Sequence, residues 1–314
     1  MTLAPAVVVL PAFTDAEYTG DASEVAPWHE RYDFDRQVAI AGCKHELQYA
    51  SAPDIALVPT GIGKSAAATT VAALAAGDEV ALEDATILTV GIAGCNPAAG
   101  TVGSVFVTDR VVDGDIKLRI GETTRRMQWL VDEYIWELNA DLVERAIGAA
   151  QDVSLADSAR VQAIRTDYDD SRSPTVDTGA TVCGDEVYHG TTAATQVAQL
   201  CASYGLTAFA TTEMEDAGTV TALERFGLLD QYISVRAASN FDREPAGGDP
   251  VESIERDVFE LGAENAVRVG HAIVQELLTE LHFCNTRQDV PDCPPTDSQS
   301  DSGSRPSNPR AGQR

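Results

Sequence analysis

Lysine is scarce in this 314-residue chain, which has only Lys44, Lys64 and Lys117, so arginine supplies most of its positive charge. The 22 lysines and arginines stand against 49 aspartates and glutamates, and the formal net charge is −27. A surface of this sign repels phosphate backbones and anionic lipids. The composition therefore argues against nucleic acid as a partner.

Long apolar runs are also missing, and none approaches the roughly 20 residues that a helix needs to cross a bilayer. Residues 1–10 are apolar but have neither a basic flank nor a clear cleavage site, which favours a first buried strand over a signal peptide. We therefore expect a cytoplasmic protein without a membrane span. Its acidic, lysine-poor composition resembles that of proteins from salt-loving archaea, where concentrated salt screens self-repulsion.

The six cysteines include no CxxC pair, and none stands at a metal-ligand spacing from the five histidines. This pattern is typical of buried or free thiols in a reducing compartment. We expect neither a structural metal site nor a cofactor.

Short apolar runs alternate with segments of helical periodicity along most of the chain. The predicted strands are residues 7–10, 55–58, 87–90, 104–107 and 233–235. The predicted helices are residues 65–76, 129–150, 191–204 and 262–281. Such alternation predicts an α/β fold with a mainly parallel or mixed sheet covered on both faces.

Two segments depart from this alternation. Residues 152–181 are polar and weakly periodic, which predicts a long excursion over the surface. Residues 285–314 are rich in Pro, Ser, Asp, Gly and Arg and cannot bury enough apolar surface to offset their ordering entropy. We predict one domain over residues 1–284, followed by a disordered polar tail.

The segment TGIGKS at residues 60–65 follows a predicted strand and opens a predicted helix. It ends like a P-loop, but the first glycine that a P-loop requires is replaced by Val58. The loop is too short to cradle a triphosphate, which argues against an NTPase. A tight strand-to-helix turn, with glycines supplying backbone freedom, explains the segment as well.

Three further segments place polar or small residues at strand ends, where open α/β sheets build their sites. Residues 89–94 (TVGIAG) end a strand in glycines that allow close approach to the backbone, although a packing turn has the same pattern. Residues 211–217 (TTEMEDA) offer carboxylates for a vicinal ribose diol, or ordinary partners of a helix dipole. Residues 235–243 (VRAASNFDR) offer polar groups, or a turn stabilised by Asn and Asp side chains.

Taken together and in this order, the four segments resemble the nucleoside phosphorylase superfamily. The stretch TGIGKSAAATTVAAL is similar to one in bacterial methylthioadenosine and adenosylhomocysteine nucleosidases. The stretches GIAGCNP, CGDEVYHG, TTEMEDAGTV and VRAASNFDR resemble the purine nucleoside permease family within that superfamily. The resemblance spans about residues 7–281. It implies a three-layer α/β/α fold with a mixed central sheet, assembly as a homo-oligomer, and a reaction at the N-glycosidic bond of a purine nucleoside.

Carried over residue by residue, the resemblance implies a nucleoside site. Glu215 would bind the ribose hydroxyls, and Met214 would pack on the sugar. Val187 and Tyr188 would line the base, and Asn240 occupies the place of an aspartate that protonates purine N7 in many relatives. The strand end with Thr89, Gly91 and Gly94 would lie against the substrate.

The resemblance leaves three roles open. Glu17, with Asp15 as the alternative, is the candidate for activating water. His189 is a candidate for the ribose 5′-hydroxyl, and a surface-loop histidine is an equal reading. Because an amide cannot transfer a proton, leaving-group stabilisation falls either to hydrogen bonding by Asn240 or to Asp242 as the acid.

Two residues at the end of the strand near Thr89 bear on the identity of the nucleophile. Bacterial purine phosphorylases carry a phosphate-binding arginine and serine where this chain has Thr89 and Ile92. The loss favours water as the nucleophile and a nucleosidase, with phosphate as co-substrate in the phosphorolytic alternative. Lys64, Arg236 or Arg243 would have to reach the site for that alternative. Asparagine at the place of Asn240 also occurs in relatives that favour 6-oxopurines.

The family name supplies a competing reading, in which the protein binds nucleosides and assists their uptake without catalysis. Such a protein needs Glu215 for the ribose but neither an acid nor an activated water. It cannot be a pore, because the sequence contains no candidate membrane span.

Deleting residues 285–314 tests the predicted domain boundary. We expect the melting temperature and the turnover of purine nucleosides to stay nearly unchanged, because the deleted segment carries few apolar residues to pack. A large loss of either quantity, measured against the full chain, would mean that the tail packs on the core.

Overall fold

The structure is a computed structural model that describes residues 2–17, 23–131, 133–256 and 258–288. Two compact units divide the chain, residues 1–278 and 279–314, and the sheet described below belongs to the first. The polar tail predicted from Asn285 onward falls largely outside the described residues, since 289–314 are not among them and residues 285–288 continue a helix.

The strands are β1 (Val7–Leu10), β2 (Arg36–Val38), β3 (Leu47–Ala50), β4 (Ile55–Leu57), β5 (Thr86–Cys95), β6 (Val105–Asp113), β7 (Leu118–Ile120), β8 (Thr123–Arg125), β9 (Ile135–Glu137), β10 (Val176–Cys183), β11 (Thr211–Glu213) and β12 (Tyr232–Phe241). The helices are α1 (Ala26–His29), α2 (Lys64–Ala76), α3 (Ala140–Ala150), α4 (Ala159–Asp167), α5 (Thr191–Ser203), α6 (Asp216–Phe226), α7 (Pro250–Ile254) and α8 (Phe259–Gln288), with a 3-10 turn at Leu229–Gln231.

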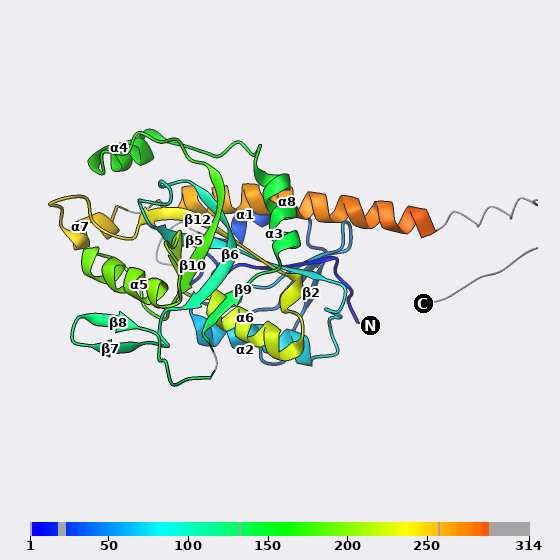
Figure 1. The fold of residues 1–314 in the computed structure, drawn as a ribbon. Coiled ribbons are helices and arrows are strands. Elements are labelled where there is room, and N and C mark those ends of the chain that lie inside the picture. The colour runs from blue at the N-terminus through cyan, green and yellow to red at the C-terminus, as the bar shows by residue number, and fades with distance from the viewer. Residues whose placement is uncertain (1, 18–22, 132, 257, 289–314) are drawn as a thin grey trace, which may run out of the picture. The chain divides into compact units, whose positions relative to one another are not determined.

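Among the described residues, ten strands form one mixed sheet in the order β11-β10-β6-β12-β5-β1-β4-β3-β2, with β9 beside β6 (Figure 1). Strand β5 pairs in parallel with β1 and β12 and, through its last residues, antiparallel with β11. Those pairings close β5, β12, β6, β10 and β11 into a ring. The predicted α/β fold with a mixed central sheet is confirmed.

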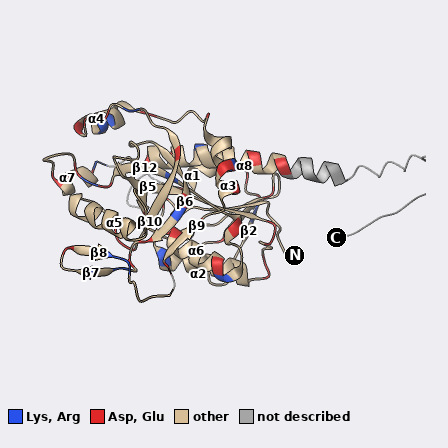
Figure 2. Ribbon diagram, viewed as in Figure 1, with Lys and Arg blue, Asp and Glu red and all other residues tan. Residues whose placement is uncertain are grey.

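Alternation along β5 separates the two helical layers. Val90 faces one side, where it lies against Gly270 of α8 and near Trp28 of α1. Thr89 faces the other side, where it contacts Tyr232, which in turn binds Asp216 at the start of α6. Figure 1 shows α8 on one face of the sheet and α2 and α6 on the other. The strands carry few charged residues in Figure 2, as expected of a sheet buried on both faces.

The helix predicted over residues 129–150 is wrong in its first half. Residues Ile135–Glu137 form β9, which pairs antiparallel with β6. Helix α3 begins only after Asn139, whose side chain accepts hydrogen bonds from the amides of Asp141 (3.1 Å) and Leu142 (3.3 Å). An asparagine in this position stabilises a helix start, and the apolar residues before it belong to the strand.

The surface excursion predicted over residues 152–181 is wrong in its last six residues, which belong to β10. The segment contains α4 and most of β10, a strand that pairs in parallel with both β6 and β11. The first half of β10 is exposed or half-buried, so its sequence lacks the apolar run that marks the other strands. Pairing with β6, rather than apolar content, holds this half in the sheet, since β11 pairs only with residues 181–183.

Helices α2 and α6 pack closely where the TGIGKS segment enters α2. Gly61 and Gly63 have φ angles of 86° and 94°, which L side chains rarely adopt. A Cβ built on Gly218 of α6 would lie 2.2 Å from the carbonyl oxygen of Lys64. The absence of a side chain at Gly218 therefore allows α6 to pack against the backbone at the start of α2.

Replacing Gly218 by alanine should destabilise the protein by roughly 1–3 kcal/mol, because overpacking displaces backbone against backbone. The matched control is Gly148→Ala in α3, where the new Cβ meets nothing within 4 Å. That change should stabilise by about 0.5–1 kcal/mol, since alanine loses less entropy in a helix. Chemical denaturation of both variants measures the two effects, and equal stabilities would contradict the packing argument.

Candidate functional site

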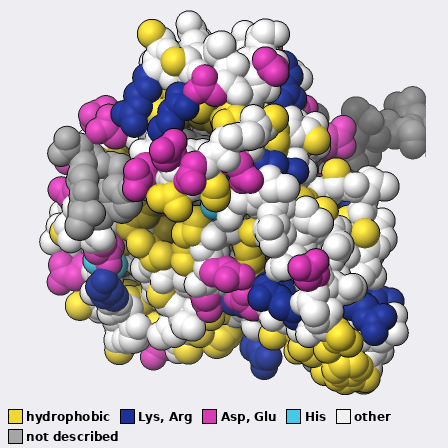
Figure 3. Space-filling view, turned by 90° about the vertical axis from the view of Figure 1, so that its left-hand side faces the viewer, with side chains coloured by type: hydrophobic (Ala, Val, Ile, Leu, Met, Phe, Trp, Pro, Cys, Tyr) yellow, Lys and Arg dark blue, Asp and Glu magenta, His cyan; other side chains and the backbone are white. Residues whose placement is uncertain are grey.

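A pocket of about 370 Å³ opens where β1, β5, β11 and β12 end. Its volume lies within the ~300–1,000 Å³ typical of small-ligand sites. Walls come from the residues after β1, the ends of β5 and β12, the β11–α6 junction, the segment around Val187 and the start of α8. Figure 3 shows hydrophobic side chains gathered in a hollow on one face of the molecule, with acidic side chains around it.

Six of the residues assigned to the site from sequence line this pocket together: Gly94, Val187, Tyr188, Met214, Glu215 and Asn240. Val187 is 67% exposed and stands at the pocket mouth, whereas Glu215 is buried at 5% exposure. The Asn240 amide nitrogen donates to the Phe241 carbonyl (2.8 Å), and its oxygen accepts from Ser239 (3.1 Å). Four segments distant in sequence thus meet at one cavity.

Glu215 is held from two sides. Its Oε1 accepts the amide of Gly63 (3.1 Å), in the turn before α2, and its Oε2 accepts Nη1 of Arg236 (3.1 Å). The glycine-rich turn that resembles a P-loop therefore orients a carboxylate instead of a phosphate. The next amide, that of Lys64, donates to Asp185 (2.8 Å).

Glu17 does not line the pocket. Its carboxylate is bound by Lys44, by the His45 ring (3.0 Å) and by the Thr14 amide (3.2 Å). Burial raises the pKa of Glu17, but these hydrogen bonds together outweigh burial and hold the pKa below its usual value. A carboxylate stabilised in this way is a weak base. Asp15, the alternative, is exposed and also lies outside the pocket walls.

Glu24, and not Glu17, is the carboxyl that follows β1 and lines the pocket. It is 2% exposed and lines the pocket, and its two oxygens accept the amides of Ala12 (2.6 Å) and Ile92 (2.8 Å). These amides lie at the ends of β1 and β5. No periodicity or motif marks Glu24, which comes from the connection between β1 and α1; only the tertiary contact with Ile92 identifies it.

Thr89 and Gly91 lie beneath the pocket instead of in its wall. The Thr89 hydroxyl is buried and bonded to the Tyr232 hydroxyl (2.8 Å). A Cβ on Gly91 would lie 2.8 Å from Oε1 of Glu24 and 3.0 Å from Nη1 of Arg236. The absence of a side chain at Gly91 thus admits these two charged groups, and not a ligand, to the backbone.

Asp242 is fully buried but is bound by Arg243, at 2.7 Å from Nε and 3.0 Å from Nη2, and lies outside the pocket walls. Burial raises the pKa of Asp242, and Arg243 opposes that rise. Lys64 is likewise engaged, with Asp113 at 2.9 Å and Asp115 at 2.7 Å. Neither Lys64 nor Arg243 is directed to the pocket.

His189 lines a second cavity of about 310 Å³, on the other side of Val187 and Tyr188. Its Nε2 lies 2.6 Å from the Ser253 hydroxyl, and burial lowers its pKa. The structure does not bring His189 to the pocket that holds Glu215.

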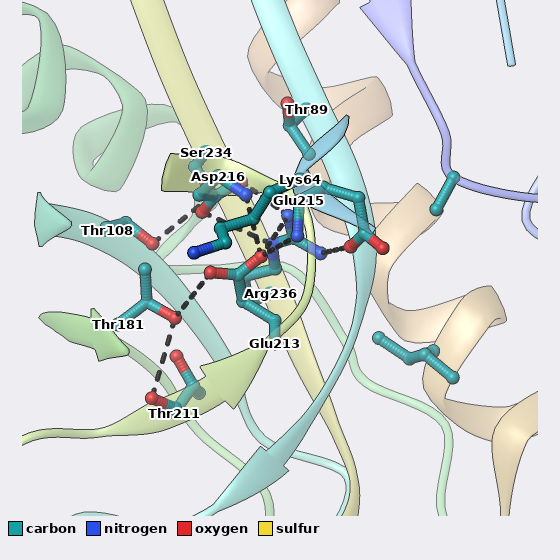
Figure 4. A network of polar contacts seen from close by, with 12 residues as sticks. Lys64, Thr89, Thr108, Thr181, Thr211, Glu213, Glu215, Asp216, Ser234 and Arg236 are labelled. Carbon is teal, nitrogen blue, oxygen red and sulfur yellow. Dashed lines mark hydrogen bonds and ion pairs between the residues drawn. The ribbon is translucent and has the colours of Figure 1, made fainter. Parts of the chain in front are cut away.

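Arg236 joins the acidic residues at the pocket floor (Figure 4). Its guanidinium binds Glu213 (2.8 Å), Glu215 (3.1 Å) and Asp216, and it is 1% exposed. Glu213 also accepts the amides of Glu215 (2.8 Å) and Asp216 (2.9 Å), so it secures the start of α6. One cation therefore faces three carboxyls, and Glu24 is a fourth beside them.

The surplus of buried acid has an electrostatic consequence. Burial and then the neighbouring Glu215 raise the pKa of Glu24 to about 7, against the pull of Arg236. Burial likewise raises the pKa of Glu213 to about 8, opposed by Arg236. At neutral pH the floor of the pocket therefore retains protons that exposed glutamates would have lost.

Within the described residues, no set of three or more His, Cys, Asp or Glu side chains is arranged to hold a metal ion. Cys43, Cys95, Cys183 and Cys201 are free thiols, and burial raises the pKa of each. The polar groups at the pocket are the carboxyls, the Asn240 amide and the hydroxyls of Tyr188, Thr212 and Ser239.

The family model for purine nucleoside permease matches residues 4–134 and 121–286. The chain belongs to the purine nucleoside permease family. A probable purine nucleoside permease of Schizosaccharomyces pombe is 28% identical over 225 residues, which is 60% of this chain, and the chain spans 65% of that relative. In the described part of this family member, no helix is both long and apolar enough to span a membrane.

Solved structures with the same fold include nucleosidases. The 5′-methylthioadenosine/S-adenosylhomocysteine nucleosidase of Colwellia psychrerythraea, solved with adenine, gives a TM-score of 0.60 at 20% identity, covering 88% of this chain and 96% of its own. The Neisseria meningitidis enzyme, solved with methylthio-immucillin-A, gives 0.59 at 19%, covering 86% and 98%. Futalosine hydrolase of Helicobacter pylori gives 0.59 at 15%, covering 88% and 98%. This purine nucleoside permease family member therefore shares the nucleosidase fold.

Replacing Glu24 by glutamine tests the buried carboxyl. Because its folded pKa lies above the unfolded value, Glu24 contributes stability that is complete below about pH 4.5 and lost as pH rises through about 7. Glu24→Gln should therefore remove on the order of 2–3 kcal/mol of the fall in unfolding free energy between pH 5 and pH 8.

Glu17→Gln is the matched control, because the pKa of Glu17 is lowered and its stabilisation is lost as pH falls. Denaturant unfolding at pH 5 and pH 8 measures both variants. An unchanged pH dependence in Glu24→Gln would show that Glu24 is ionised normally in the folded protein.

Proposed function

We propose that the protein hydrolyses the N-glycosidic bond of purine nucleosides. The observation that carries this proposal is the charge of the pocket wall. Among the described lining residues stand Glu24, Glu186, Glu213 and Glu215, and no lysine, arginine or histidine. A phosphate dianion would meet carboxylates without a free cation, whereas water and a ribose diol are neutral.

The ribose would bind between Glu215 and Met214. Glu215 is already oriented by Gly63 and Arg236, so both of its oxygens keep a fixed direction while lone pairs remain for the 2′- and 3′-hydroxyls. The half-buried Met214 supplies an apolar surface for the sugar. The base would lie against Val187 and Tyr188, with Asn240 at its N7 edge.

Water would attack C1′ of the ribose from the side of Glu24. A base whose pKa lies close to the working pH combines availability with basicity. As the C1′–N9 bond breaks, its electron pair leaves with the purine, Glu24 accepts the proton of water, and the carboxylates stabilise the cationic sugar. Asn240 donates a hydrogen bond to N7, and the departing base is protonated by solvent.

Asn240 also suggests the substrate class. Besides the hydrogen given to Phe241, the Asn240 amide nitrogen has one more, and a 6-oxopurine offers it two neighbouring acceptors, N7 and O6. Asp242 is held by Arg243, so we assign leaving-group stabilisation to Asn240. Inosine and guanosine are therefore the proposed substrates.

From composition and resemblance we further propose a cytoplasmic homo-oligomer adapted to high salt, without a cofactor. The alternative suggested by the family name is a nucleoside-binding protein that assists uptake. It would use the same ribose site without turnover.

The deciding experiment incubates the full chain with inosine in high salt, with and without phosphate, and separates ribose, ribose 1-phosphate and hypoxanthine. We expect ribose and hypoxanthine at rates independent of phosphate. Glu215→Gln should lower kcat/KM severely while the fold survives, since each charge-assisted hydrogen bond lost costs roughly 1.5–3 kcal/mol.

The other outcomes are equally informative. Ribose 1-phosphate formed only with phosphate would establish phosphorolysis in place of hydrolysis. Tight nucleoside binding with no base released from inosine, guanosine or adenosine would favour the uptake reading. Full activity in Glu215→Gln would remove Glu215 from the ribose site.

A further inference from the structure

Asp216 stands out among the buried acids because it does not line the pocket. It is fully buried at the first residue of α6, and its side chain accepts from Tyr232 (2.9 Å), from Ser234 (2.6 Å) and from the Arg236 guanidinium. The Tyr232 hydroxyl is anchored in turn by Thr89 (2.8 Å). An aspartate with this many donors is held fixed against Arg236, outside the pocket lining (Figure 4).

Arg236 and Glu24 are neighbours that do not bond. Both lie close to the point where a Gly91 side chain would begin, Glu24 Oε1 at 2.8 Å and Arg236 Nη1 at 3.0 Å. The guanidinium instead binds Glu213, Glu215 and Asp216. Asp216 takes both Nε and Nη2, which turns the flat fork of Arg236 toward α6.

We propose that Asp216 is a positioning residue that holds Arg236 away from Glu24 and so keeps Glu24 able to accept a proton. The reason is geometric: a guanidinium is planar, so Asp216, which takes Nε and Nη2, fixes the plane in which Nη1 points to Glu215 and not to Glu24. The base role of Glu24 rests on the proposed function, whereas the competition for Arg236 does not.

The surroundings of Glu24 leave few other charges to act on it. The charged groups that face it are Glu215 from the start of α6 and Arg236 from β12, while β1 and β5 contribute the amides of Ala12 and Ile92. Glu215 keeps its carboxylate in every variant considered below. A change in the ionisation of Glu24 therefore reports on Arg236.

Asp216→Asn keeps the shape of the side chain but removes its charge. Arg236 should then pair with Glu24, and a nearby cation lowers a carboxyl pKa by roughly 1–3 units. We expect the Glu24 carboxyl to titrate with a pKa of about 7 in the wild type and at least about one unit lower in Asp216→Asn. The acid limb of the pH profile of kcat/KM should move down by the same amount.

The direct measurement is a titration of ¹³C-carboxyl-labelled glutamate in the full chain by NMR, with the Glu24 signal assigned by its loss in Glu24→Gln. Ser234→Ala is the matched control, because it removes one hydrogen bond to Asp216 (2.6 Å) without removing charge. It should leave the Glu24 titration within a few tenths of the wild type. Asp216→Ser, with a smaller neutral side chain, should repeat the shift if Asp216→Asn folds poorly.

An unchanged Glu24 titration in folded Asp216→Asn or Asp216→Ser overturns the proposal, and so does an equal shift in Ser234→Ala, which would trace the effect to loosening of the network. A downward shift confined to the Asp216 variants supports it. If the Asp216 variants show that shift but the wild-type protein cleaves no nucleoside, the proposed hydrolase function fails. The control of Arg236 by Asp216 then still stands.

Discussion

The ion cluster around Arg236 is the constraint on which the pocket depends. Transferring a guanidinium and several carboxylates out of water costs several kcal/mol per ion, and only close, well-directed hydrogen bonds offset it. Glu213 at the end of β11 and Glu215 and Asp216 at the start of α6 supply those bonds, while Arg236 projects from β12. Gly91 on β5 leaves room for the cluster. Arg236 therefore links strand β12, the start of α6 and the carboxyls of the pocket floor.

The cluster is also unbalanced, and the imbalance shapes the chemistry. One cation faces three carboxyls directly, with Glu24 beside them, so the field above the floor is negative unless protons are retained. A negative field favours a ribosyl group that becomes cationic and disfavours a phosphate dianion. The same imbalance distinguishes this pocket from sites built to hold anions on free arginines.

Sequence patterns located the pocket wherever a residue follows directly from a strand end. Met214, Glu215 and Asn240 come from segments whose position is set by β11 and β12, so their convergence follows from the α/β topology. Glu17, which also follows β1, instead pairs with Lys44 and His45 outside the pocket wall. Glu24 reaches the pocket because its oxygens bind amides at the ends of β1 and β5, a contact that joins residues 68 apart.

The difference between local sequence signals and tertiary contacts also explains which secondary-structure predictions were wrong. The helical periodicity of residues 129–150 predicts a helix correctly only beyond Asn139, the N-cap of α3. Ile135 and Trp136, which lie before this cap, belong to strand β9. Strand β10 carries Thr, Gly and Asp in its exposed half, which pairing with β6 holds in the sheet, so local composition does not reveal it. Tertiary pairing decided these elements against local preference.

Fold likeness to nucleosidases does not by itself establish catalysis, because one fold hosts many functions. The energetic cost of burying Glu24 is more informative. A protein that only binds nucleosides needs Glu215 and an apolar wall, and it gains nothing from a second carboxyl buried on two backbone amides. Glu24 lowers stability as it ionises, and a neutral residue of the same size would remove that cost. Buried acids whose pKa approaches neutrality concentrate at catalytic sites, where proton transfer repays the cost in stability. Glu24 is therefore the residue on which the proposed hydrolysis depends and which binding alone would not need.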